Sequence, residues 1–141
     1  MRNMVTALRP TEVRTAAADA VPKVAAMLGD AFSNDPFYTW LLPGSLRLQA
    51  RLRTMFAAEM EQYVVPNGTV WPTSGFDGAV AELPPGAWEM SKSMTGKEAL
   101  KWTRALGRRL LLAGRVRRAM EERHLREPHF YVRTVGVRTA M

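Results

Sequence analysis

The sequence predicts an α/β fold with a mixed sheet of about four strands, two N-terminal helices, and a helical insertion before the last strand. Short segments rich in β-branched and aromatic residues alternate with longer segments that carry apolar residues at helical spacing. The segment that follows Pro128 and ends at Val137 has apolar residues on both alternations, which is typical of a central strand buried on both faces. The chain has 141 residues, 47% of them hydrophobic, which is enough for one domain with a buried core.

The N-terminal half predicts one strand and two helices. Residues 4–8 predict a short first strand. Asp19 is a suitable N-cap for a helix that ends near Phe32, because apolar residues recur at helical spacing between them. The sequence Ser-Asn-Asp-Pro at 33–36 breaks this helix, and an aromatic cluster follows it. A second amphipathic helix is predicted over residues 46–63.

The C-terminal half predicts a hairpin, a helical region and a last strand. Residues 69–72 and 79–83 are short strand segments on either side of a Gly-containing turn, so they predict an antiparallel hairpin. Residues 97–126 are helical, as two helices broken near Gly114. In the last strand, Gly136 marks a bulge or a place where another group approaches the backbone closely.

Composition excludes several classes of protein. There is no cysteine, so disulfides, thiolate nucleophiles and Cys-ligated metals are excluded. No apolar run approaches membrane-spanning length, so we expect a cytoplasmic protein without a membrane partner. His124 and His129 lack a third donor in register, so we expect no metal site.

The net charge of +7 comes from one segment, since residues 101–126 contain nine basic and two acidic residues. Basic residues share one side of a helical wheel, and apolar residues occupy the other. The basic set is Lys101, Arg104, Arg108, Arg115 and Arg118. This pattern keeps open a small binding or regulatory module that uses this face on nucleic acid or another polyanion. Nucleic acid is the less favoured partner, because the chain has no recognisable DNA-binding motif. A solvated helix face is the simpler interpretation.

The last strand also carries a family resemblance. Its sequence, Pro-His-Phe-Tyr-Val-Arg-Thr-Val-Gly-Val, resembles the fourth strand of the GNAT N-acetyltransferases, especially the puromycin N-acetyltransferase-like branch. The order of elements and the Pro-Pro-Gly turn at 84–86 fit the same comparison. In that family the strand leads into Pro-x-x-Gln/Arg-x-x-Gly-x-Gly/Ala, which holds the pyrophosphate of acetyl-CoA. Here Arg138-Thr139-Ala140-Met141 follows instead.

The resemblance therefore implies a partial GNAT fold. Residues 1–141 are expected to form a single, truncated GNAT-like domain, with residues 97–126 as a basic helical insertion within it. This domain corresponds to the N-terminal portion of the family's fold and ends before the acetyl-CoA pyrophosphate loop.

The resemblance also implies site residues. Val135, Gly136 and Val137 take the positions whose backbone contacts the acetyl group and pantetheine arm of acetyl-CoA. A core strand with a bulge glycine is the alternative. Glu127 and His129 lie where a general base for the incoming amine is often found in the family. For Glu127, pairing with a neighbouring arginine is the alternative.

The implied function is transfer of acetyl from acetyl-CoA to a small-molecule amine, with this chain alone expected to be inactive. Loss of three or four hydrogen bonds to pyrophosphate, each worth roughly 1.5–3 kcal/mol, removes on the order of 5–10 kcal/mol of binding. A truncated enzyme without activity of its own is a further interpretation. We also expect self-association, or a partner that adds a strand, along the edge between Phe130 and Val137.

Overall fold

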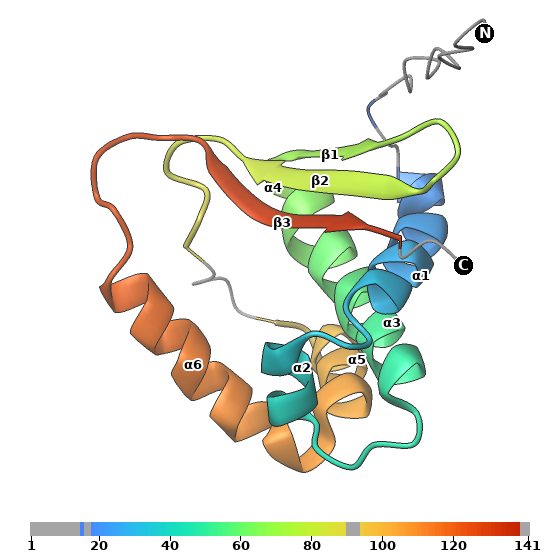
Figure 1. The fold of residues 1–141 in the computed structure, drawn as a ribbon. Coiled ribbons are helices and arrows are strands. Elements are labelled where there is room, and N and C mark those ends of the chain that lie inside the picture. The colour runs from blue at the N-terminus through green and yellow to red at the C-terminus, as the bar shows by residue number, and fades with distance from the viewer. Residues whose placement is uncertain (1–14, 16–17, 90–93, 139–141) are drawn as a thin grey trace, which may run out of the picture.

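The computed structural model describes residue 15 and residues 18–89 and 94–138 (Figure 1). Its helical elements are the 3₁₀ turns η1 (Ala18–Ala20) and η3 (Gly107–Arg109), the π-helical segment η2 (Met60–Val64), and the α-helices α1 (Val21–Ala31), α2 (Pro36–Leu41), α3 (Leu48–Glu59), α4 (Val65–Asn67), α5 (Gly96–Leu106) and α6 (Leu110–Glu122). Its strands are β1 (Thr69–Pro72), β2 (Gly78–Leu83) and β3 (Tyr131–Val137). The strand predicted at residues 4–8 lies outside the described residues.

The three strands form one antiparallel sheet in the order β1-β2-β3. The predicted hairpin is confirmed, with β2 beginning one residue earlier than expected, at Gly78. The expected mixed sheet of about four strands is not seen in the described part of the chain, where all the pairing is antiparallel. Helix α1 and segment η2 pack against one face of the sheet, below it in Figure 1.

Strand β3 lies at an edge of this sheet, so the prediction of a central strand buried on both faces is wrong. Within the described residues its one strand neighbour is β2. Val132, Val135 and Val137 are 52%, 56% and 71% exposed, because the described helices all lie on the other face of the sheet. Of the two alternating sets of apolar residues in this strand, one therefore lies on an exposed face of the sheet.

A β-bulge interrupts the pairing of β3 with β2. Ala81 pairs with Thr134 and Glu82 pairs with Val132, which leaves Arg133 as the extra residue. Successive side chains of a regular strand point to opposite faces. At the bulge this alternation is broken, and Arg133 and Thr134 are both partly buried while Val132 and Val135 on either side are exposed. The bulge therefore turns two consecutive polar side chains toward the helices.

Gly136 lies outside the bulge and pairs with Ala79. Of the two roles expected for it, close approach is the one observed, and the approaching group is α1. A Cβ at this position would lie 2.8 Å from Leu28 Cδ2 and 3.1 Å from Phe32 Cε2. A residue without a side chain is needed because the helix lies directly on the strand.

Helix α1 is confirmed at the predicted position, but its N-cap is Ala20 and not Asp19, which lies in the preceding 3₁₀ turn. The aromatic cluster after the predicted break forms a helix of its own, α2. Its N-cap is Asp35, whose carboxylate accepts hydrogen bonds from Phe37 N at 2.9 Å and Tyr38 N at 3.3 Å. This cap fixes the position from which α2 presents its aromatic side chains.

The predicted helix at 46–63 is longer than expected and changes type along its length. It begins as α3, becomes π-helical in η2, and ends in α4 before Gly68. Leu52, Phe56 and Met60 are fully buried and form the centre of the core. Glu59 lies among these apolar residues, at the junction between α3 and η2.

The helical region predicted at 97–126 does contain two helices, but the break is at Gly107 and not near Gly114. Gly107 has a φ of +53°, a conformation that side chains other than hydrogen disfavour. Gly114 lies within α6, where a glycine is tolerated at a small cost. No described helix is long and apolar enough to cross a membrane.

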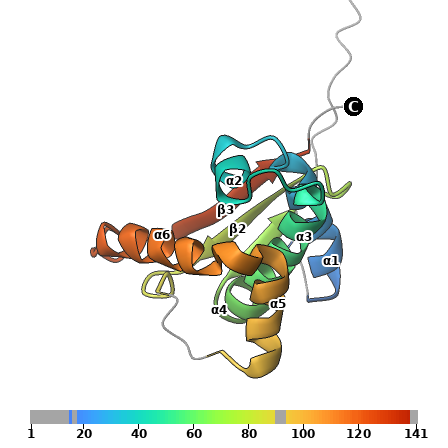
Figure 2. The ribbon, with the colours of Figure 1, turned by 90° about the horizontal axis from the view of Figure 1, so that it is seen from below.

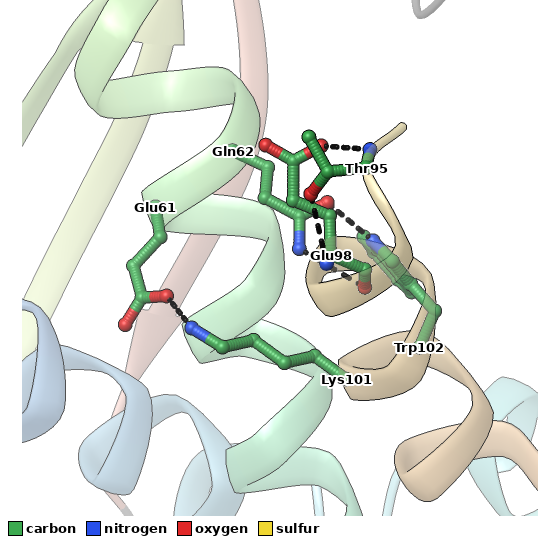
Figure 3. A network of polar contacts seen from close by, with 6 residues as sticks. All are labelled: Glu61, Gln62, Thr95, Glu98, Lys101 and Trp102. Carbon is green, nitrogen blue, oxygen red and sulfur yellow. Dashed lines mark hydrogen bonds and ion pairs between the residues drawn. The ribbon is translucent and has the colours of Figure 1, made fainter. Parts of the chain in front are cut away.

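Helix α5 is attached to η2 by polar contacts that Figure 3 shows. A capping box begins the helix, because Thr95 N donates to Glu98 Oε2 at 2.8 Å and Glu98 N donates to Thr95 Oγ1 at 3.3 Å. Trp102 Nε1 donates to Gln62 Oε1 at 2.8 Å, and Lys101 forms an ion pair with Glu61. These contacts fix the Trp102 ring beside Tyr63, at a centroid distance of 6.3 Å.

Alanine substitutions at Gly114 and Gly107 should have opposite effects on the stability of the protein. Gly114→Ala should stabilise the protein by about 0.5–1 kcal/mol, because a helical alanine loses less backbone entropy and its Cβ meets no atom within 4 Å. Gly107→Ala should destabilise it by about 1–3 kcal/mol, since alanine is strained at positive φ. Urea denaturation of the two variants tests this. A loss of stability in Gly114→Ala would contradict the placement of α6.

One edge of β3 has no strand neighbour within the described residues, which predicts self-association of the purified chain. We expect Val135→Lys to reduce it, because a lysine on an exposed edge strand opposes pairing with another chain. Leu111→Lys is the matched control, since Leu111 is 78% exposed on α6 and carries the same added charge away from the sheet. Light scattering after size-exclusion chromatography is the measurement. A wild-type monomer, or equal effects of the two lysines, would contradict this prediction.

Candidate functional site

A cavity of about 400 Å³ lies between α6 and the elements α2, α3, η2, α5 and β3. Figures 1 and 2 both show α6 and α1 on opposite sides of the molecule, so α6 lies away from the contact between α1 and the sheet. The apolar residues predicted on one side of the 97–126 region all line the cavity: Trp102, Leu106, Leu110, Ala113, Val116 and Met120. The apolar face of this region therefore borders the cavity, while Leu106, Leu110 and Ala113 also pack in or against the core.

The most buried charged group on the cavity wall is Glu59, which is 7% exposed. Its Oε1 accepts a hydrogen bond from Arg133 Nε at 2.5 Å, and its Oε2 accepts a longer one from Thr134 Oγ1 at 3.4 Å. Burial alone would lower the pKa of Arg133, but the charge of Glu59 and its hydrogen bond outweigh burial and raise that pKa. Arg133 is therefore charged at neutral pH, opposite the Glu59 carboxylate.

Both members of this ion pair sit at irregular positions of the backbone. Glu59 is the last residue before the π-helical segment η2, and Arg133 is the extra residue of the bulge in β3. Such π segments and bulges change the direction of nearby side chains and are frequent at functional sites. In this chain they bring a carboxylate and a guanidinium from residues 74 positions apart into contact.

Two tyrosines on the wall remain protonated. Burial raises the pKa of Tyr38, and the nearby charge of Glu59 raises it further. Burial also raises the pKa of Tyr63. A raised pKa keeps both phenols neutral under ordinary conditions, so each of these lining residues retains a hydroxyl that can donate a hydrogen bond.

A histidine pair lies at the end of the cavity where α6 leads into β3. His124 Nε2 lies 2.8 Å from His129 Nε2, and His129 Nδ1 lies 2.6 Å from the carbonyl oxygen of Glu127. A carbonyl oxygen only accepts, so His129 Nδ1 carries a proton. In the neutral ring, His129 Nε2 then accepts from His124 Nε2–H, which leaves His124 Nδ1 as the basic nitrogen.

The His124 ring is partly buried and contacts aromatic groups. It stacks on Trp88 with centroids 4.0 Å apart and meets Tyr131 edge-on at 4.7 Å. Burial and then the neighbouring His129 lower the pKa of His124, and Glu121 opposes them. His124 is therefore a neutral imidazole on the cavity wall at neutral pH, able to accept a proton.

The residues predicted as general base are close to the cavity but do not line it. Glu127 contributes its backbone carbonyl, and its side chain is exposed. His129 contacts His124, which does line the cavity. The structure therefore brings His129 to the site as a partner of another histidine.

The predicted cofactor residues Val135, Gly136 and Val137 do not line the cavity either. Gly136 is buried against α1, and the two valine side chains lie on the exposed face of the sheet. Their predicted contacts come from backbone and not from side chains, and the edge of β3 opposite β2 has no strand partner within the described residues.

Sequence reasoning did not single out Glu59 or Arg133. One signal was present for Glu59, which continues the apolar stripe of Met55 and Phe56 at helical spacing. A carboxylate in such a stripe needs a buried partner. No pattern in the sequence marks Arg133 as that partner, because the bulge that turns it inward depends on pairing with β2.

No protein-family model and no curated protein sequence matches this chain. Among solved structures, it is similar to one from Corynebacterium glutamicum described as histone acetyltransferase HPA2 and related acetyltransferase. The TM-score is 0.58 and the sequence identity 20%, and the similarity covers 90% of this chain and 60% of the other. This chain thus spans about 60% of the length of that protein. The comparison shows that this chain shares the fold of part of that protein.

The histidine pair predicts a pH dependence of stability. The pKa of His124 is lowered on folding, so the unfolded chain binds more protons, and the unfolding free energy should fall as the pH falls through and below 6.5. Glu121, His129 and Tyr131 are the titratable groups nearest to it. His129→Gln should raise the pKa of His124 part of the way back, because burial remains. NMR titration of the His124 ring measures this, and an unchanged or lower pKa would contradict it.

Proposed function

We propose that this chain forms the acceptor-binding part of an acetyl-CoA-dependent N-acetyltransferase of the GNAT type. The strand sequence that resembles the puromycin N-acetyltransferase-like branch supports this placement within the family. The cavity between α6 and β3 is the acceptor site, and Glu59 holds the amine as an ammonium ion. The observation that carries the proposal is the position of the cavity in an acetyltransferase-like fold, directly beside β3 and with a buried carboxylate on its wall.

The reaction is direct transfer. The neutral amine attacks the thioester carbonyl, the C–N bond forms, the C–S bond breaks, and coenzyme A leaves as a thiolate that takes up a proton. Since the amine must lose its proton, a neutral imidazole on the wall is a suitable acceptor, and His124 is such a group. Tyr38 offers a protonated hydroxyl on the same wall.

The chain fits part of acetyl-CoA. Acetyl-CoA supplies the activated acetyl group when it is bound. The edge of β3 at Val135, Gly136 and Val137, which has no strand neighbour in the described part of the chain, offers backbone groups to the pantetheine arm. No segment of the 141 residues matches Gln/Arg-x-x-Gly-x-Gly/Ala. Missing pyrophosphate contacts cost on the order of 5–10 kcal/mol, or roughly four to seven decades of affinity. We therefore propose that the 141-residue chain alone is inactive.

Polyanion binding by the basic face is the second candidate. Arg104, Arg108, Arg115 and Arg118 are all exposed, as a binding face requires. Other members of the basic segment have structural contacts: Lys101 pairs with Glu61, and Arg109 Nε donates to Leu41 O at 2.7 Å. The free part of this face is therefore smaller than the net charge suggests.

Amide shifts during acetyl-CoA titration of the 141-residue chain distinguish the two functions. We expect no saturable binding at micromolar concentration, and at millimolar concentration shifts of the Val135, Gly136 and Val137 amides. Adenosine 3′,5′-bisphosphate is the control, because it carries the phosphates without the pantetheine arm and should not shift them.

Two results would count against acetyl transfer. If both ligands shift only the amides near Arg115 and Arg118, the chain binds polyanions and the cofactor assignment fails. If acetyl-CoA binds with a dissociation constant near 10 micromolar, about 7 kcal/mol, another group replaces the pyrophosphate loop and the predicted inactivity is wrong.

A further inference from the structure

The walls of the cavity are mainly apolar, and six of the residues that line it are aromatic, which restricts what can bind there. Its aromatic residues come from α2, η2, α5, β3 and the segment after β2: Phe37, Tyr38, Tyr63, Trp88, Trp102 and Tyr131. A cavity of about 400 Å³ is in the range that holds one small organic molecule. Aromatic side chains bind apolar and especially aromatic groups through large contact areas.

The charges on the wall cancel. Among the described residues that line the cavity, Glu59 pairs with Arg133 at 2.5 Å, and Glu121 pairs with Arg117 at 4.0 Å. His124 adds no charge, since its imidazole is neutral at neutral pH. A polyamine would bury several ammonium groups in a cavity with too few carboxylates to replace their hydration. A polyphosphate would bury several negative charges in a cavity with too few unpaired cationic side chains to bind them.

One hydrogen-bond position on Glu59 remains for a ligand. Arg133 occupies Oε1, whereas among the described residues Oε2 accepts a hydrogen bond from the hydroxyl of Thr134 alone, at 3.4 Å, well beyond the usual O–H···O distance. An ionised carboxylate binds further donors strongly in a site shielded from water. The cavity therefore offers one place for one ammonium group, next to aromatic walls.

We propose that the ligand of this cavity is a small arylalkylamine, with its ammonium group at Glu59 and its ring among the aromatic side chains. The inference names the acceptor class for the proposed acetyl transfer and rests on that function for its biological meaning. It excludes polyamines, because one carboxylate position is available. It also excludes a protein lysine side chain, which brings no ring to cover the aromatic walls.

Calorimetry with tryptamine as the probe tests this without acetyl-CoA. Tryptophol, which has a hydroxyl in place of the amine, spermidine, and an acetyl-capped lysine peptide are the comparators. Tryptamine should bind at least about tenfold more tightly than each, as expected for one hydrogen bond to a charged group. Glu59→Gln should remove most of the preference for tryptamine over tryptophol.

A second variant does not disturb the ion pair. Gly114 lines the cavity, and a Cβ there meets no atom within 4 Å, so Gly114→Leu should fill part of the space and weaken tryptamine and tryptophol alike. Leu111→Ala is the matched control on the same helix, because Leu111 is 78% exposed and does not line the cavity. It should leave binding unchanged.

Spermidine or the lysine peptide binding as tightly as tryptamine would overturn the proposed class. Tryptamine binding that is unaffected by Gly114→Leu would place the ligand elsewhere and would also overturn it. Failure of acetyl transfer is a separate result. If tryptamine binds as expected while acetyl-CoA shifts no β3 amide, the ligand class stands and the transferase function falls.

Discussion

The ion pair between Glu59 and Arg133 is the interaction on which the rest of the site depends. A carboxylate that is 7% exposed requires a charged, hydrogen-bonded partner, since an unpaired buried charge is strongly destabilising. The partner comes from β3, and it faces inward because of the bulge in the pairing with β2. Helix α3 and strand β3 are thereby joined at the wall of the cavity. The charge of Glu59 also helps to raise the pKa of Tyr38 on the same wall.

The cavity lies beside α6, which contacts the core through the partly buried Leu110, Leu112 and Ala113. No residue of α6 is fully buried, although its apolar face is well formed. Two contacts position its surroundings: Arg109 joins the turn before α6 to the end of α2, and Gln62 holds Trp102 in α5 (Figure 3). The histidine pair and Trp88 lie at the other end of α6. An apolar helix face that borders a cavity in this way is typical of a binding site.

Much of the fold was predictable from sequence because local patterns determine it. The apolar spacing around Leu28 and Phe56 gave α1 and α3, and the turn between β1 and β2 gave the hairpin. The helix break was misplaced because nothing local shows that Gly107 has a positive φ while Gly114 is helical. The exposure of β3 was also missed, since the bulge hides the alternation of its buried and exposed residues. The site itself was least predictable, because Glu59 and Arg133 meet only through tertiary structure.

A double-mutant cycle on Glu59 and Arg133 is the most direct test that this pair organises the structure. Each methionine substitution alone, Glu59→Met and Arg133→Met, should cost about 3–5 kcal/mol of unfolding free energy in urea, because it leaves the other charge buried and unpaired. The double variant should lose clearly less than the sum of the two, with a coupling of about 1–3 kcal/mol. Additive losses, or single variants as stable as the wild type, would show that the two groups do not depend on one another and would contradict the account.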